Sequence, residues 1–392
     1  MRSNLLLRSR RYFVLVLGAC AGMAVGLGAM GWSARASFDW LTWATEERGA
    51  VADASVVVIA LDRELLRTHG APGEARLTRA GMALLVRRLA ELKPRAIGLD
   101  VEFPRAREPE GDQALAEALA AAGDVTLPEA VVTLPDSAVT LRAPIAPIAE
   151  AARHVGFVTI GADADGTVRR VCLARTLDGM RRHHFALYAA ARMMGAEAIQ
   201  VLRDRVVIPR RPPAPALAVP VDAAATAWVR FTGDQPLPVI PGSALLAPGG
   251  PDARWRSLVA DRFALVGGVE EMFADHHRVP AARVDAHRER LAGVLVLGQI
   301  IADVLESRLI LEAPPWVTGA LAAALALLAA WIAAALGTGL ALGALCVLLV
   351  AVLFGCIQAF LSGTLVDLAL LAALPVVVFA VVRLTRWRAQ VG

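Results

Sequence analysis

Val56–Leu61 reads VVVIAL, a continuous apolar run with β-branched residues. Such a run is typical of a strand that is buried on both faces, as in a parallel sheet. Leu77–Leu92 repeats apolar residues at helical spacing, Pro94 stops this helix, and Ala96–Val101 (AIGLDV) is a second strand-like run. A strand, a helix and a strand in this order predict a largely parallel sheet with helices packed on it.

Further elements follow along the chain. Asp112 caps a helix that we expect to run to Ala122. The turn residues GADADG at 161–166 predict a hairpin between the strand-like segments Val155–Ile160 and Thr167–Ala174. The other expected elements are helices over His183–Met194 and Ala286–Leu305, strands over Trp228–Phe231 and Phe263–Gly268, and a surface loop over Pro209–Pro220.

Long apolar stretches flank this region. Of the 392 residues, 57% are hydrophobic and 19% are charged, whereas soluble proteins average about 45–50% and about 25%. Val14–Ser33 has no charge, and Trp316–Val382 has only Asp367. Because a spanning helix needs about 20 apolar residues, we expect transmembrane helices at 14–33, 316–336, 338–361 and 364–382. Asp367, near the outer end of the last span, is either interfacial or functional.

The basic residues orient these spans. The net charge of +4 comes from the two ends, since residues 1–13 carry four arginines and residues 383–392 carry three, with no acid in either. Positive charge is retained in the cytoplasm, so both tails are cytoplasmic and residues 34–315 are exported. The remainder is slightly acidic, which excludes a nucleic-acid partner. Ala34-Arg35-Ala36 also fits a signal-peptide cleavage site; cleavage would leave three spans and the same exported domain.

Four carboxylates are candidate ligand-binding residues. Asp62 and Asp100 follow the first two strands, and Glu102 lies two residues further on. Ligands of open α/β sheets gather at the carboxyl ends of the strands, so these side chains either converge on a ligand or cation or cap loops and helix starts. Asp275 is the fourth candidate, after the strand that ends in Gly267-Gly268.

Metal and enzyme sites are not indicated. Asp275-His276-His277 has adjacent histidines but no second cluster at metal-ligand spacing, so we interpret it as a solvated loop. Asp163-Ala164-Asp165-Gly166 lacks the later ligands of a calcium loop. No nucleophile motif, phosphate loop or kinase signature is present, and we expect no enzyme activity, metal or cofactor. An exported metal hydrolase is the alternative, and it requires Asp62, Asp100 and His276 to meet in one cleft.

Six segments, in order, resemble a known family. They read VVVIALD at 56–62, RAIGLDVEF at 95–103, DQALAEAL at 112–119, GFVTIGADADGTVRRV at 156–171, HFALYAAAR at 184–192 and FALVGGVEEMFADHHRVP at 263–280. Together with one span before and three after, this order resembles the type-two CHASE domain, an extracytoplasmic sensor found with bacterial adenylate cyclases, histidine kinases and Ser/Thr kinases. The chain departs from the family's pattern at Gly70–Arg76, Val279-Pro280 and Leu297-Gly298.

The resemblance implies a bacterial transmembrane sensor. We expect an α/β extracytoplasmic sensor domain with a mixed, largely parallel sheet, plus four transmembrane helices, one before and three after. An unknown small molecule or protein is the stimulus, and its binding shifts the spans through the connectors Ser33–Phe38 and Glu312–Trp316. Because ten residues follow the last span, the signal passes to a protein partner or through a homo-oligomer. Alternatives are a structural or assembly subunit of a membrane complex, or a truncated sensor of a cyclase or kinase.

Overall fold

The chain divides into two compact units, each described by itself. The computed structural model describes residues 32–45, 55–133, 139–177, 179–210, 212–231, 237–249, 253–280 and 290–391. The helical unit comprises Met1–Thr45 and Ile310–Gly392, and the α/β unit comprises Glu46–Leu309. The predicted first span lies outside the described residues except for its last two positions. Residues 34–45, counted above with the exported segment, cluster with the helical unit.

A seven-stranded sheet forms the centre of the α/β unit. Its order is β13-β1-β14-β2-β3-β4, with β5 paired to β3. Its strands are β1 (Val56–Leu61), β2 (Ala96–Leu99), β3 (Val125–Thr133), β4 (Val139–Arg142), β5 (His154–Phe157), β13 (Val239–Pro241) and β14 (Phe263–Gly268). All pairs are parallel except β3 with β4. The prediction of a mixed, largely parallel sheet is therefore confirmed, and every residue of β1 is buried.

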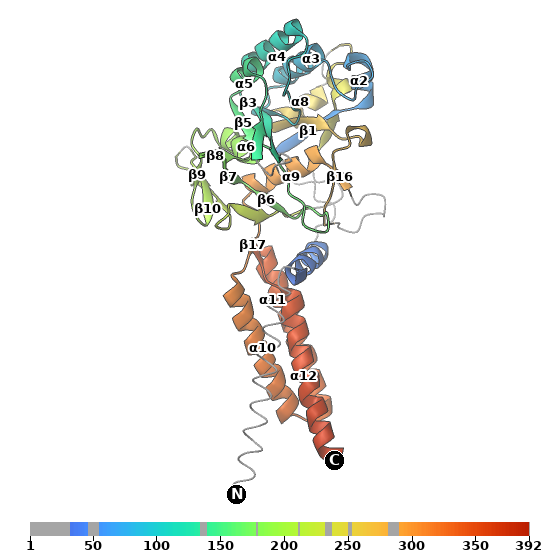
Figure 1. The fold of residues 1–392 in the computed structure, drawn as a ribbon, viewed down its shortest axis with the longest axis vertical. Coiled ribbons are helices and arrows are strands. Elements are labelled where there is room, and N and C mark those ends of the chain that lie inside the picture. Colours follow the sequence, from blue (N-terminus) through green and yellow to red (C-terminus); the bar gives the residue numbers. More distant parts are fainter. Residues whose placement is uncertain are drawn as a thin grey trace. The chain divides into compact units, whose positions relative to one another are not determined.

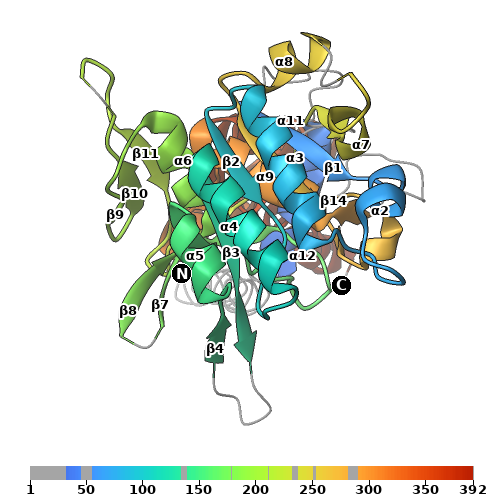
Figure 2. The ribbon, with the colours of Figure 1, turned by 90° about the horizontal axis from the view of Figure 1, so that it is seen from above.

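Helices cover both faces of this sheet (Figures 1 and 2). They are α2 (Arg63–His69), α3 (Arg79–Glu91), α4 (Pro109–Ala122), α5 (Ala146–Ala151), α6 (Phe185–Met194), α7 (Gly242–Leu245), α8 (Ala253–Val259) and α9 (Gly293–Leu305). One core joins Ile59 and Val266 to α3 and α4. On the other face Val58 and Leu265 lie against Gly298 of α9. Successive strand residues thus face opposite layers, as a pleated strand requires.

Two sequence predictions in the accessory strands are wrong. Short pairs join β6 (Arg170–Cys172) to β12 (Thr226–Trp228) and β7 (Ala174–Leu177) to β8 (Met180–His183), and β9 (Gln200–Val201), β10 (Arg205–Ile208) and β11 (Leu217–Pro220) form a small sheet. The predicted hairpin around residues 161–166 does not form, because β5 joins the central sheet and β6 pairs with β12. The end of the predicted Pro209–Pro220 loop is instead the strand β11 at a sheet edge, where proline is tolerated.

The helical unit contains three helices that are long and apolar enough to cross a membrane, α10 (Pro315–Ala335), α11 (Thr338–Leu361) and α12 (Leu368–Val391). This agrees with the three predicted C-terminal spans. The last begins at Leu368 rather than at residue 364, because Thr364–Leu365 forms β18, which pairs with β17 (Leu311–Glu312). Outward-facing Leu340 and Val347 are 74% and 71% exposed, as suits a surface that lipid covers.

Candidate functional site

A pocket of about 680 Å³ lies at the carboxyl ends of the central strands, and we call it the carboxyl-edge pocket. Leu61, Val101 and Gly268 bring the ends of β1, β2 and β14 to it, and Gly293 brings the first residue of α9. Ligands of open α/β sheets bind at this edge. Three of the four predicted carboxylates, Asp100, Glu102 and Asp275, line this one pocket.

Asp100 lies where β2 ends. Its backbone N–H donates to the Val266 carbonyl over 2.7 Å, which holds it beside β14. Burial of the carboxyl group, and then the negative charges of Asp275 and Glu102, raise the pKa of Asp100 to about 7. Asp100 lines the pocket, so a proton or a cationic group of a ligand there can reach its carboxyl group.

Asp275 packs against the start of α9. Its Oδ1 lies 2.9 Å from His277 Nε2, and the histidine lowers the pKa of Asp275. A Cβ on Gly293 would lie 2.1 Å from Asp275 Oδ2, so only glycine permits this close approach. The Gly293 N–H donates to the Asp275 carbonyl over 2.8 Å. The carboxylate therefore meets the positive end of the α9 dipole.

Glu102 and several arginines form the rest of the polar wall. Glu102 Oε2 lies 2.6 Å from the Arg142 guanidinium of β4, and this contact raises the pKa of Arg142. Arg79, Arg105 and Arg107 also line the pocket. The pocket thus offers carboxylates and guanidinium groups together, which suits a small ligand that carries charge.

A buried ion pair supports the loop between β2 and α4. Arg79 Nε donates to Asp112 Oδ1 over 2.7 Å, with both residues at most 6% exposed. The Arg79 guanidinium also donates to the Arg105 carbonyl and lies 4.6 Å from the Phe103 ring centroid, while Arg107 N–H donates to Asp112 Oδ2 over 2.8 Å. The prediction that Asp112 caps α4 is wrong, since the helix begins at Pro109 and the carboxylate is taken by Arg79. Sequence reasoning missed Arg79, because nothing local signals a pair 33 residues apart.

Asp62 lies outside the pocket-lining set. Its Oδ1 accepts from Leu65 N–H over 3.0 Å as the cap of α2, and its Oδ2 accepts from Ser243 N–H over 2.9 Å. Both oxygens therefore stabilise the chain itself, which was the alternative stated above. The site retains Asp100, Glu102 and Asp275 and leaves Asp62 out.

The two adjacent histidines lie in a strand and not in a solvated loop, so that prediction is wrong. His276 begins β15 (His276–Arg278), which pairs antiparallel with β16 (Arg290–Ala292) and leaves both histidines partly buried. Alternation along the strand separates them: His277 lines the carboxyl-edge pocket and His276 does not. The described residues contain no group of three or more His, Cys, Asp or Glu side chains placed to hold a metal. Of the three residues that the metal-hydrolase alternative requires, only Asp100 lines the pocket.

Asp163 and Asp165, considered above as calcium ligands, form ion pairs with an arginine instead. Arg169 lies 3.0 Å from Asp163 and 2.8 Å from Asp165, and its hydrogen bonds lower the pKa of Asp165 far below the ordinary value. This arginine is 3% exposed, so the pairs stabilise the turn from within.

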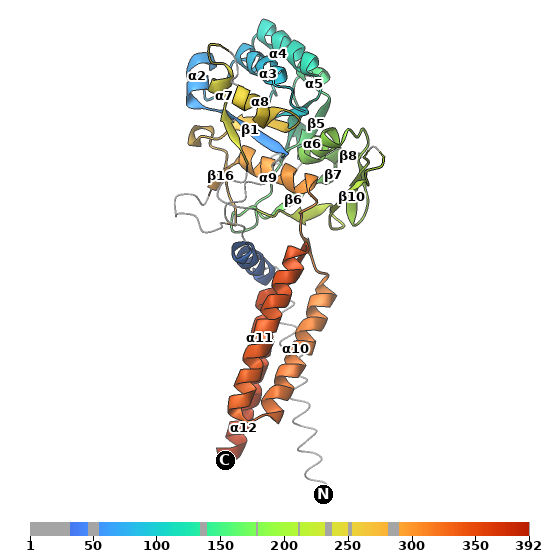
Figure 3. The same cartoon turned by 180° about the vertical axis from the view of Figure 1, so that it is seen from behind.

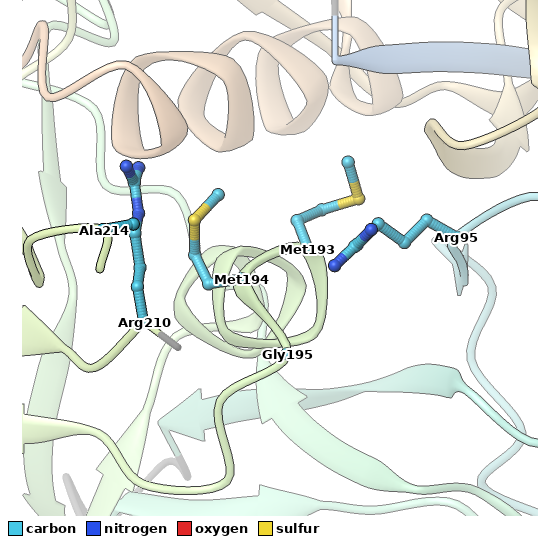
Figure 4. A pocket seen from close by; sticks show the side chains of 6 residues that line it. All are labelled: Arg95, Met193, Met194, Gly195, Arg210 and Ala214. Carbon is cyan, nitrogen blue, oxygen red and sulfur yellow. The ribbon is translucent and has the colours of Figure 1, made fainter. Parts of the chain in front are cut away.

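A second hollow, of about 480 Å³, lies at the end of α6 (Figure 4). Met193, Met194 and Gly195 line it together with Arg95, Arg210 and Ala214. Arg95 precedes β2, so this hollow lies at the amino end of that strand, away from the sheet edge where ligands gather. Its lining contains no carboxylate. We therefore favour the carboxyl-edge pocket as the functional site.

The fold and pocket define a class of protein: a largely parallel α/β domain with a charged pocket at its carboxyl edge, in one chain with three membrane-length helices. The chain belongs to the CHASE2 domain family, whose model matches residues 14–340. CHASE2 domains are extracellular sensory domains. No curated protein and no solved structure matches the chain significantly.

Proposed function

We propose that this protein is a bacterial inner-membrane sensor whose exported α/β unit binds a small polar molecule in the carboxyl-edge pocket. The gathering of Asp100, Glu102 and Asp275 at the carboxyl ends of the strands carries this proposal. Membership of an extracellular sensory family and three membrane-length helices support it. The protein acts as a receptor, not an enzyme.

The charges of the pocket favour a ligand with an ammonium group. Asp100 and Asp275 lie on the side of the α9 start, and Arg105 and Arg107 lie on the loop after β2. An ammonium group near Asp100 offsets the mutual repulsion of the carboxylates. A carboxylate on the same ligand is then within the field of the arginines, so an amino acid or related zwitterion fits better than a simple acid.

The helical unit offers a route for the signal. Both predicted connectors contact the segment between α11 and α12: Ala313 N–H donates to Leu365 O over 2.8 Å, and Ser37 Oγ donates to Asp367 Oδ1 over 3.0 Å. A ligand can shift these connectors only by binding one state of the protein more tightly than another. Movement of either connector then acts on α12, which leads to the basic tail and to a partner protein or a second copy.

The test is a thermal-unfolding panel on the full chain in detergent. We use amino acids, the amines left by their decarboxylation, and the matching carboxylic acids. A ligand at 100 times its Kd stabilises the folded state by about 2.7 kcal/mol, which for a domain of this size raises Tm by about 5–10 °C. Amino acids or amines should give this shift, and simple acids should not.

Variants locate the binding site. The double variant Asp100→Asn/Asp275→Asn removes both charges and should abolish the shift. Glu117→Gln is the matched control, because Glu117 is an exposed carboxylate of α4 outside the pocket lining. A panel without any hit, or a shift that persists in the double variant, would contradict the proposal.

A further inference from the structure

A helix over residues 32–44 packs one face inside the helical unit. Ser37 and Phe38 are 2% and 0% exposed, and Leu41 is fully buried. The helix, blue in Figures 1 and 3, crosses the ends of α11 and α12 obliquely instead of running along them. It is therefore an element distinct from the spanning helices.

Hydrogen bonds to Asp367 hold this helix against the rest of the helical unit. The carboxylate is 5% exposed and accepts hydrogen bonds from the hydroxyls of Ser33 and Ser37. Ser37 Oγ also accepts from the Ala369 N–H over 2.9 Å, and Phe38 meets the Phe360 ring at 5.7 Å in an edge-to-face contact. The buried face is thus fixed to the turn between α11 and α12.

The opposite face carries three tryptophans. Trp32 is 69% exposed, Trp40 is 39% exposed and Trp43 is 37% exposed. At about 100° per residue the three lie within a sector of about 80°, on the side away from Leu41. The Trp40 and Trp43 rings lie 6.0 Å apart. Three large aromatic side chains on one exposed face mark an interaction surface.

The dimensions of the bundle place this helix at a membrane surface. Asp367 directly precedes α12, and Trp387 lies twenty residues further on, which is about 30 Å of helix, the thickness of a bilayer's hydrocarbon core. Trp387 is 59% exposed at the inner end, and Trp316 is 76% exposed in the first turn of α10 at the outer end. Exposed tryptophans at two levels form the aromatic belts of a spanning protein.

We propose that residues 32–44 form an interfacial helix, whose tryptophans insert into the boundary between headgroups and acyl chains of the outer leaflet. An indole ring has an apolar body and one N–H donor, which suits this partly hydrated interfacial layer. Asp367 holds the other face to the bundle, so the lipid surface and the α11–α12 turn together fix the depth of the connector. This role is independent of the ligand in the carboxyl-edge pocket.

Quenching of tryptophan fluorescence by lipid tests the proposal. The full chain is placed in vesicles of phosphatidylcholine and phosphatidylglycerol that carry a nitroxide on the headgroup or in the middle of the acyl chain. The signal is the difference between the wild type and Trp32→Phe/Trp40→Phe/Trp43→Phe. We expect the headgroup nitroxide to quench this difference at least about twofold more strongly than the mid-chain nitroxide, because the rings lie at the interface.

The control is Trp255→Phe in α8 of the α/β unit, whose difference signal neither lipid should quench. If the triple variant does not insert, Trp43→Phe alone supplies the comparison. A difference signal that neither nitroxide quenches would place the helix in water and refute the proposal. Stronger quenching by the mid-chain nitroxide would refute it as well, because it would indicate a spanning segment.

Discussion

Removing the buried partner of Arg79 should destabilise the α/β unit strongly. In Asp112→Ala the Arg79 cation, 5% exposed, loses its carboxylate at 2.7 Å. Breaking a buried ion pair at one partner costs about 3–5 kcal/mol, and the loss of the acceptor for Arg107 N–H adds about 1 kcal/mol. Since 1 kcal/mol shifts Tm by about 2–4 °C for a domain of this size, we expect Tm to fall by roughly 8–24 °C.

The measurement is thermal and denaturant unfolding of the full chain in detergent, followed by tryptophan fluorescence. The double variant Arg79→Met/Asp112→Leu removes both charges and should recover most of the loss, because an apolar pair of similar volume is often neutral in such a position. Glu91→Gln is the control: it breaks the exposed Arg88–Glu91 pair and should cost less than about 0.5 kcal/mol. A loss below about 1 kcal/mol in Asp112→Ala would refute the buried-pair account.

Three further results are expected of the α/β unit. Because the pKa of Asp100 rises from 3.8 in the unfolded state to about 7 in the folded state, protonation of this group favours the folded state, and its contribution to the free energy of unfolding should be lost between about pH 4 and about pH 7. In a pH series of unfolding curves, the free energy of unfolding of the wild type minus that of Asp100→Asn should therefore decline over this range, because the opposite slope from buried His184, whose pKa is lowered to about 3, is common to both proteins. Asp303, whose pKa burial also raises to about 7, contributes to the pH dependence in the same direction as Asp100, and Asp303→Ala should cost about 1–3 kcal/mol in denaturant unfolding by leaving the Arg230 N–H without its acceptor. Gly293→Ala should displace Asp275, since a Cβ there meets Asp275 Oδ2 at 2.1 Å. The apparent ligand affinity, measured from the concentration dependence of the Tm shift, should then fall at least about tenfold.

Periodicity was enough for β1, β2 and β14 of the central sheet, but it gave no prediction for β3, β4 or β13. Val56–Leu61 and Phe263–Gly268 match β1 and β14 residue for residue, because strands buried on both faces have an unbroken apolar pattern. The hairpin at 161–166 was wrong because a turn sequence fixes a local turn but does not choose the partner of a strand. Parallel pairing of β5 with β3 is a long-range contact, and no local signal encodes it.

The candidate site was also predictable only in part. The rule that ligands gather at carboxyl ends of strands selected Asp62, Asp100 and Glu102, and the pocket contains Asp100 and Glu102 together with Asp275. The rule does not distinguish a pocket carboxylate from a helix cap, and Asp62 is a cap. Arg79 lines the pocket and pairs with Asp112 of α4, 33 residues away in the sequence, so tertiary packing, not sequence spacing, assigns its role.

Hydrogen–deuterium exchange on the full chain tests the central claim most directly. The experiment compares the protein with and without the panel compound that gives the largest Tm shift. Ligand binding in the carboxyl-edge pocket predicts slower exchange at residues 100–107 and 273–278, which carry the lining residues Asp100, Arg105 and Asp275. Protection confined to the hollow at the end of α6, or no protection within the α/β unit, would contradict the account.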